Sequence, residues 1–179
     1  MARLPQRIVC LSTETVEVLY LLGEEARIAG ISGFTTHPPR ARKEKPKVSG
    51  FSSAKIERIL AVEPDLVLAF SDLQGDIARD LIQAGVAVHV FNHRSVDGIL
   101  AMIETVGRLV GAEGRALALV AELERTIATE RANGEARAAR LGHRPKVYFE
   151  EWNEPLITGI RWVSELIGIA GGDDCFGEL

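Results

Sequence analysis

Hydroxyl and carboxyl side chains follow the first predicted strand, in the segment Ser12-Thr13-Glu14. The segment directly follows the apolar residues 7–11 and leads into a run with helical spacing. A turn between a strand and a helix can hold a polar or anionic group, and Ser12 or Thr13 can equally cap the helix. The sequence has no G-x-S-x-G elbow, Walker A loop or G-x-G-x-x-G fingerprint. The segment is therefore the one feature that supports a small α/β hydrolase or a nucleotide-dependent enzyme.

The four histidines are scattered along the chain, at His37, His89, His93 and His143. His89 and His93 are four residues apart, but they fall on a predicted strand and the loop after it, not on one helical face. A zinc or manganese receptor would need His37, His93 and Asp72 to converge in the fold. Surface and capping positions are the expected ones for these histidines. We therefore predict neither a metal site nor a cofactor.

Aromatic residues gather where predicted strands end. Phe34, Phe51 and Phe70 fall at strand ends or in the loops that follow strands, and Trp152 falls in a loop after a later strand. In an open α/β sheet those ends line the ligand crevice. Flat rings there would form an apolar platform for a large ligand, although each ring taken singly is better explained as a loop anchor packed on the core.

The first half of the chain alternates short apolar segments with helical patterns. The predicted strands are residues 7–11, 27–31, 65–70 and 86–91, and the predicted helices between them are residues 16–22, 54–63 and 76–84. Residues 33–53 are predicted to form a long loop that carries a basic patch. Strands that alternate with helices indicate a parallel, doubly wound sheet with right-handed crossovers.

The second half begins without any strand signal. Residues 95–140 have helical spacing, and 113–140 are predicted to form one long, partly exposed helix. A strand at 146–150, a loop at 152–159 and a helix at 162–170 follow. The predicted organisation is an N-terminal α/β lobe (1–94), a helical linker (95–144) and the start of a second α/β lobe (145–179). A separate lobe needs at least about 50 residues, so the second lobe is expected to be partial, and its open sheet edge favours self-association.

Composition excludes several classes of protein. The 179 residues carry a net charge of −4 and are 46% apolar, which argues against a nucleic-acid binder and against disorder. No apolar run approaches the roughly 18 residues of a membrane span. The segment before the first predicted strand, residues 1–7, is short and polar, so we expect no signal peptide. We therefore expect the chain to be a cytoplasmic protein or a mature or shortened form of an exported one.

Four segments resemble a known family, the helical-backbone class of ABC-transporter substrate-binding proteins, which carry cobalamin, ferric siderophores and haem. The segments run from Arg7 to Glu14, from Gly30 to Pro39, from Gly50 to Ala69 and from Glu151 to Gly172. They cover nearly the whole chain in the family's order, and the last looks most like the cobalamin-binding branch. The resemblance implies two α/β lobes joined by a rigid helix, with an expected location in the periplasm. It agrees with the α/β fold class, the Rossmann-like parallel-sheet lobe and the long connecting helix predicted from periodicity.

The resemblance also implies roles for particular residues. The first-lobe wall of the ligand pocket and the beginning of the second-lobe wall would be formed by Ser12, Thr13, Phe34, His37, Phe51, Phe70, Trp152, Asn153 and Trp162. Glu57 matches the first-lobe glutamate that docks on the permease. Charge pairs of that kind steer the encounter and fix its register more than they add affinity.

The leading hypothesis is a non-enzymatic importer component that binds a corrinoid in a cleft and reaches the membrane only through its permease. A ferric siderophore or haem is the near alternative, for which Arg40, Arg94 and Arg161 could serve as cationic partners. A zinc or manganese receptor, a small α/β enzyme and a stable fragment without function remain as further readings. Nucleic acid is not an expected partner.

Overall fold

The computed structural model describes residues 4–177, and the chain divides into two units. Unit 1 contains the residues up to Asn92 together with Met102–Ala116, and unit 2 contains His93–Ala101 and the residues from Leu117 onward. The chain passes between the units inside two helices, α5 (Val96–Val110) and α6 (Glu113–Leu141). None of the helices in the described part of the chain is both long enough and apolar enough to cross a membrane.

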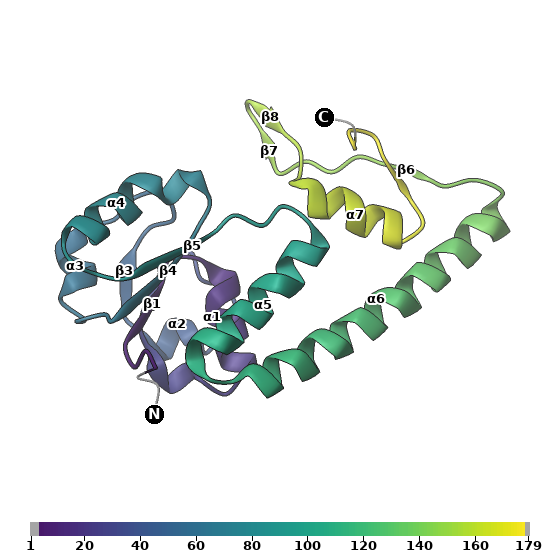
Figure 1. The fold of residues 1–179 in the computed structure, drawn as a ribbon. Coiled ribbons are helices and arrows are strands. Elements are labelled where there is room, and N and C mark those ends of the chain that lie inside the picture. Colours follow the sequence, from purple (N-terminus) through teal and green to yellow (C-terminus); the bar gives the residue numbers. More distant parts are fainter. Residues whose placement is uncertain (1–3, 178–179) are drawn as a thin grey trace. The chain divides into compact units, whose positions relative to one another are not determined.

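Unit 1 is built on a five-stranded parallel sheet with the strand order β3-β2-β1-β4-β5 (Figure 1). The strands are β1 (Ile8–Cys10), β2 (Ile28–Ser32), β3 (Lys47–Ser49), β4 (Leu66–Phe70) and β5 (Val88–Phe91). Every residue of β1 and β4 is buried, as expected for strands that are covered on both faces. The predicted α/β fold class with a doubly wound parallel sheet is confirmed.

Short helices cover the two faces of this sheet. They are α1 (Thr13–Leu21), α2 (Ala41–Glu44), α3 (Ile56–Leu60) and α4 (Gly75–Gln83), with single 3-10 turns at Glu25–Arg27 and Asp72–Gln74. One buried cluster joins alternate strand residues, such as Val9 and Val67, to Ile59 of α3 and to Ile77 and Leu81 of α4. Because side chains alternate across a strand, the intervening strand residues face the opposite side, where α1 lies (Figure 1).

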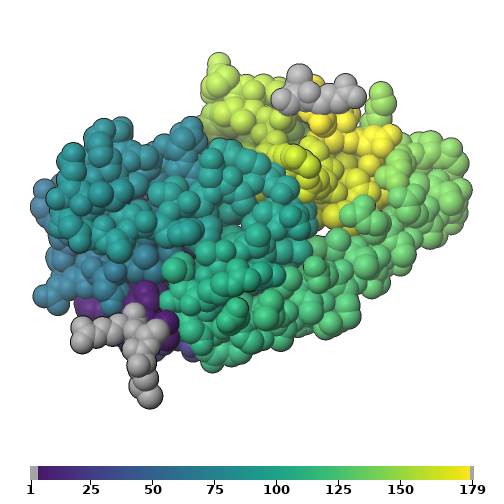
Figure 2. Space-filling view, in the orientation of Figure 1, coloured from purple at the N-terminus to yellow at the C-terminus, as the bar shows by residue number. Residues whose placement is uncertain are grey.

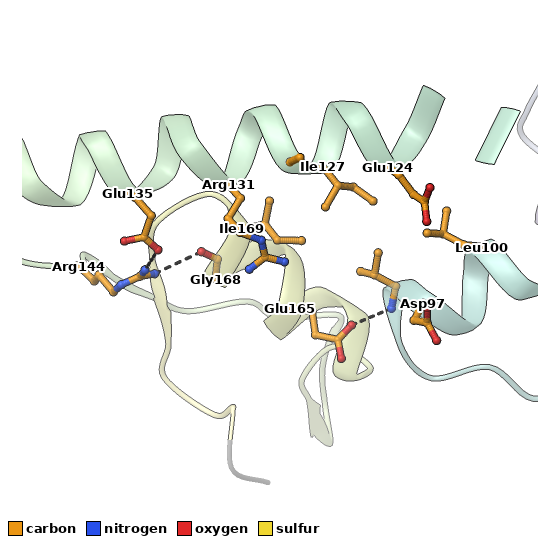
Figure 3. A pocket seen from close by; sticks show the side chains of 12 residues that line it. Asp97, Leu100, Glu124, Ile127, Arg131, Glu135, Arg144, Glu165, Gly168 and Ile169 are labelled. Atoms are coloured by element: carbon orange, nitrogen blue, oxygen red, sulfur yellow. Dashed lines mark hydrogen bonds and ion pairs between the residues drawn. The ribbon is translucent and has the colours of Figure 1, made fainter. Parts of the chain in front are cut away.

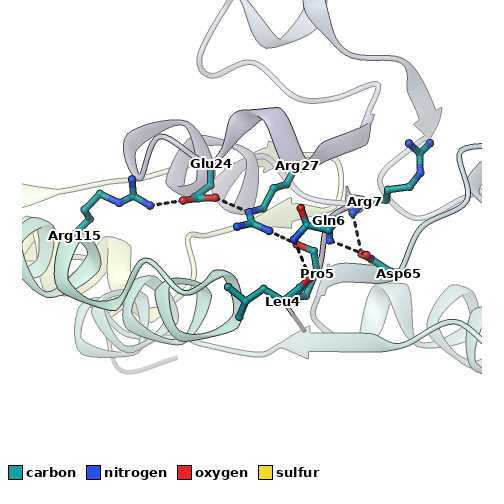
Figure 4. Close-up of polar contacts among 8 residues, drawn as sticks. All are labelled: Leu4, Pro5, Gln6, Arg7, Glu24, Arg27, Asp65 and Arg115. Carbon is teal, nitrogen blue, oxygen red and sulfur yellow. Dashed lines mark hydrogen bonds and ion pairs between the residues drawn. The ribbon is translucent and has the colours of Figure 1, made fainter. Parts of the chain in front are cut away.

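The amino-terminal end of the sheet is tied together by the segment that precedes β1. The Asp65 carboxylate accepts hydrogen bonds from the backbone N–H of Gln6 (2.7 Å) and of Arg7 (2.9 Å). The guanidinium of Arg27 donates to the carbonyl of Pro5 at 2.6 Å (Figure 4). These bonds fix β1 between β2 and β4 before the chain enters the first turn.

The second stretch of unit 1, Met102–Ala116, is a tight helical corner. A Cβ on Gly107 would lie 2.3 Å from the Cβ of Ala116, so only glycine allows α5 and α6 to approach this closely. Arg115 at the start of α6 forms an ion pair with Glu24, which also holds Arg27 at 2.5 Å (Figure 4). This carboxylate therefore connects the corner to the rest of unit 1.

Unit 2 combines most of α6 with α7 (Arg161–Ile169) and two small sheets. β6 (Lys146–Val147) pairs in parallel with β9 (Asp173–Asp174), and β7 (Trp152–Asn153) pairs with β8 (Leu156–Ile157) as a hairpin. The buried Gly134 of α6 lies directly against the backbone after α7. A Cβ built on Gly134 would be 2.3 Å from the carbonyl oxygen of Ile169, so the two segments meet backbone to backbone.

Three predicted element boundaries were wrong. The predicted loop at 33–53 contains α2 and the edge strand β3, which is only three residues long and has a single buried apolar residue, Val48. The predicted strand at 146–150 ends at Val147, and the predicted loop at 152–159 contains the hairpin β7–β8. The long helix predicted over 113–140 is confirmed as α6.

Candidate functional site

The first turn after β1 places Ser12 and Thr13 at the carboxyl end of the sheet. Ser12 occupies the position before the first residue of α1, but its hydroxyl makes no capping hydrogen bond and lies 3.5 Å from the hydroxyl of Thr15. The Thr13 hydroxyl donates to the carbonyl of Phe34 at 3.4 Å. The turn is therefore bonded to the residues after β2, and the Ser12 side chain does not cap α1.

A second link joins the ends of β2 and β3. The backbone N–H of Phe34 donates to the Ser32 hydroxyl at 3.2 Å, and that hydroxyl donates to the carbonyl of Gly50, also at 3.2 Å. The N–H of Gly33 donates to the carbonyl of Ser49 at 2.8 Å. These bonds hold the backbone under Phe34 while its side chain stays 68% exposed. Phe34 is thus an apolar ring presented to solvent from a well-tied loop.

Gln74 forms the third link and is the central residue of this edge. It is fully buried, and its side-chain carbonyl accepts a hydrogen bond from the N–H of Phe70 at 2.9 Å. Its side-chain amide donates to the carbonyl of Leu11 (3.0 Å) and to the carbonyl of Phe51 (2.8 Å). One side chain therefore joins the ends of β1 and β4 to the loop that carries Phe51.

The remaining unit 1 candidates differ in exposure. Phe70 is only 8% exposed and Phe51 is half-buried, so both rings contribute mainly to the edge of the core. His37 is exposed, and its ring nitrogen lies 3.1 Å from the hydroxyl of Thr36. Glu57 is exposed on α3, and none of the described residues forms an ion pair with it. The network at the sheet edge therefore brings Thr13, Phe34 and Phe51 together and leaves His37 and Glu57 outside it.

Two ionisable groups lie beside this edge. Burial raises the pKa of the Glu14 carboxyl above its ordinary value of 4.5, against the effect of hydrogen bonds from its own backbone N–H and from Ser12. Burial also raises the pKa of the Cys10 thiol to about 12. A thiol that stays protonated is a poor nucleophile, so Cys10 does not supply the chemistry that an enzyme would need at this point.

Unit 2 carries the other predicted site residues. Trp152 and Asn153 lie on the hairpin β7–β8, which is at the surface of this unit (Figure 2). The Trp152 ring is 60% exposed, and its indole N–H donates to the carbonyl of Glu154 at 3.0 Å. Trp162 is the second residue of α7, and its ring centroid lies 5.7 Å from that of His93. Burial and the charge of Arg94 lower the pKa of His93, which keeps this ring neutral.

A cavity of about 620 Å³ lies inside unit 2 between α6, α7 and the start of α5 (Figure 3). Glu165 accepts a hydrogen bond from the N–H of Val96 at 2.7 Å at one end of the cavity. Arg144 donates to the carbonyl of Gly168 (3.2 Å) and pairs with Glu135 at the other. None of the predicted site residues lines this cavity. Among the described residues, no group of three or more His, Cys, Asp and Glu side chains is placed to hold a metal ion.

Comparison with known proteins extends what the geometry indicates. Residues 8–179 match the family described as "Periplasmic binding protein". The chain belongs to this family. The resemblance predicted from the four sequence segments is confirmed.

The family match is supported by relatives and by solved structures. The cobalamin-binding protein of Halobacterium salinarum is 32% identical over 178 residues, which cover 98% of this chain and 47% of the relative. The periplasmic vitamin B12 binding protein of Vibrio cholerae has a similar fold (TM-score 0.79, 22% identity, 98% of this chain and 68% of that one). The periplasmic haem-binding protein of Roseiflexus sp. RS-1, in its apo form, also has a similar fold (TM-score 0.82, 23% identity, 97% of this chain and 66% of that one). The chain thus spans about half the length of the Halobacterium relative.

Proposed function

We propose that this protein is the substrate-binding component of an ABC importer and that its ligand is a corrinoid. The observation that carries the proposal is the exposed ring of Phe34 on a backbone tied to Thr13, Ser32 and Gly50 at the carboxyl end of the sheet. The carboxyl ends of the strands are where open α/β sheets bind their ligands, so a ring held at this edge is placed to contact one. Relatives that match nearly the whole of this chain are named for cobalamin or vitamin B12.

The ligand would contact aromatic and polar side chains of both units. In unit 1 the proposed contacts are Ser12, Thr13, Phe34, His37, Phe51 and Phe70, and in unit 2 they are Trp152, Asn153 and Trp162. A corrinoid presents a broad ring system with amide side chains around it. Flat aromatic rings would cover its face, and hydroxyl and amide groups would pair with its rim. No covalent step and no resident cofactor are part of this proposal.

Glu57 is the proposed contact with the permease. Its carboxylate is exposed on α3 without a cationic partner among the described residues, so its charge is free for an arginine of another protein. This contact would place the protein in the periplasm, against the outer face of the transporter. We expect Glu57→Ala to reduce ligand uptake through a reconstituted permease at low salt. Glu17→Ala, which removes another exposed carboxylate on α1, should leave uptake unchanged.

A ferric siderophore or haem is the alternative ligand, because solved structures with this fold include haem-binding and siderophore-binding proteins. Two of the cations suggested for that ligand are already engaged in the structure. Arg40 lies 3.4 Å from a carboxylate oxygen of Glu25, and Arg161 donates to Glu165 at 2.8 Å. These pairs favour the corrinoid over an anionic iron complex.

Titration with cyanocobalamin by calorimetry tests the proposal, with a ferric hydroxamate and haem measured in parallel. We expect saturable one-to-one binding of the corrinoid, weakened at least tenfold by Phe34→Ala, because that ring would lose its contact with the ligand. Leu73→Ala provides a matched control, since Leu73 is another exposed apolar side chain of unit 1. Binding of the ferric complex alone would assign the alternative ligand. Absence of binding by all three would refute ligand capture by this chain.

A further inference from the structure

A second concave site lies in unit 1, between the edge strand β3 and the start of α3. The cavity has a volume of about 390 Å³ and is lined by Lys47, Val48, Ser49, Gly50, Ser53, Ala54, Lys55 and Arg58. Its wall is formed where the chain turns back after β3, with Ser49 bridged to Ala54 and the N–H of Gly50 bonded to the carbonyl of Ser53 at 2.8 Å. A volume of this size falls in the usual range of small-molecule sites, roughly 300–1,000 Å³.

The charge of this cavity is entirely of one sign. Three of its lining residues, Lys47, Lys55 and Arg58, are cationic, and no carboxylate lines it. The nearest acidic residue in the sequence is Glu57, which does not line the cavity. This concentration of positive charge stands out in a chain with a net charge of −4.

These cations are also uncompensated. Among the described residues, Lys55 and Arg58 have no side-chain hydrogen bond or ion pair, and the Lys47 ammonium group donates only to the carbonyl of Arg42. Several other basic side chains of unit 1 have acidic partners, as Arg27 and Arg79 do. Three cations held around one hollow repel one another, and an anion in the hollow would relieve that repulsion.

One hydroxyl group at the same place has no partner. The Ser49 Oγ is shielded from solvent and makes no hydrogen bond to any described residue. A serine side chain turns about a single torsion angle, so this hydroxyl meets an oxyanion in the cavity once the side chain rotates toward it. Ser53, which is exposed, offers a second hydroxyl from the same wall.

We propose that this cavity, which we call the β3 edge pocket, binds a small oxyanion of the phosphate class. Phosphate carries nearly two negative charges near neutral pH and offers several acceptor oxygens in different directions. It can therefore accept from two ammonium groups, a guanidinium and a hydroxyl at once, whereas a carboxylate offers only two oxygens. The site is independent of the proposed corrinoid contacts, because none of the residues assigned to them lines it.

Calorimetry and two-dimensional amide NMR with inorganic phosphate test the pocket, in a chloride-containing buffer at constant ionic strength. We expect saturable one-to-one binding, with shifts centred on residues 47–58. Arg58→Gln and Lys55→Gln should each weaken binding about tenfold, as loss of a charge-assisted hydrogen bond does. Lys43→Gln is the matched control, because Lys43 is an exposed, unpartnered cation of the same region that does not line the pocket.

Three results would overturn the proposal. The first is a shift that grows linearly without saturation, and the second is an equal loss of binding in Lys43→Gln. The third is retention of the protein on phosphatidylglycerol vesicles without any binding of free phosphate, which would assign these cations to a membrane surface. All variants replace exposed side chains, so thermal unfolding should be unchanged and the comparison does not depend on folding.

Discussion

Replacement of Gln74 by leucine should destabilise unit 1 more than any exposed substitution can. The side chain is fully buried and satisfies three backbone groups: the N–H of Phe70 and the carbonyls of Leu11 and Phe51. Leucine fits the space but supplies neither donor nor acceptor. All three groups would then be left without their partner, and only the half-buried Phe51 could regain one from water.

The magnitude follows from the burial of those groups. A buried polar group without a partner costs about 1–3 kcal/mol, so two buried groups and one half-buried group give a total of roughly 3–5 kcal/mol. The free energy of unfolding of a domain is typically only about 5–15 kcal/mol. Gln74→Leu should therefore lower the urea midpoint strongly and accelerate amide hydrogen exchange at the ends of β1 and β4.

The assay is urea unfolding followed by circular dichroism, with native-state hydrogen exchange to locate the effect. Gln83→Leu is the matched control, because Gln83 is exposed at the end of α4 and its replacement should change stability by less than about 0.5 kcal/mol. Gln74→Glu provides a second variant of equal size. Its carboxylate would face the two carbonyls, so its stability should partly recover at acid pH, where the protonated carboxyl can donate. A loss below about 1 kcal/mol in Gln74→Leu would refute the role assigned to these bonds.

Three further predictions concern charge and backbone approach. Burial raises the pKa of Glu24, but hydrogen bonds and charges from its two arginine partners outweigh this effect and lower the pKa below 4.5. Glu24→Gln should therefore be less stable than the wild type at pH 7. The difference in stability should disappear as the pH falls through the lowered pKa. The raised pKa of Glu14 has the opposite effect on stability, because ionisation of this carboxyl destabilises the fold as the pH rises above 4.5. In thermal unfolding, Glu14→Gln should be more stable than the wild type at pH 7 and equally stable at pH 3. Gly134→Val should destabilise unit 2 by at least about 2 kcal/mol through backbone overlap, whereas Gly168→Ala, with open space around it, should stabilise by up to about 1 kcal/mol. Urea unfolding of the Gly134 and Gly168 variants checks this pair, and equal midpoints would contradict the close approach.

The sequence predicted the strongly periodic elements correctly and the short polar ones poorly. Buried strands such as β4 are almost wholly apolar, and α6 sustains its helical spacing for many turns, so both were predicted. β3 was missed because only Val48 of its three residues is buried. The hairpin β7–β8 was missed because all four of its residues are exposed and no alternation of burial marks them.

The candidate site shows the same division. Residues next to strand ends, such as Thr13 and Phe34, could be predicted to lie near one another because the carboxyl ends of parallel strands meet at one edge of the sheet. The role of Gln74 could not be predicted. No sequence signal distinguishes a buried glutamine that bonds to several backbone groups from a solvated glutamine in a polar turn. Its role depends on bonds to residues 63 and 23 positions away in the sequence, and only the fold makes those visible.

The position of β1 has a consequence for the order of events during synthesis. Of the five strands of this sheet, β1 leaves the ribosome first, and both of its sides are filled in the finished sheet, by β2 on one side and β4 on the other. β2 follows within about twenty residues, but the bonds from Gln6 and Arg7 to Asp65 span 59 and 58 positions. The nascent chain must therefore carry a half-paired apolar strand until β4 emerges from the ribosome. Chaperone binding to ribosome-stalled chains should be weaker when residue 70 has left the ribosome than when it is still inside.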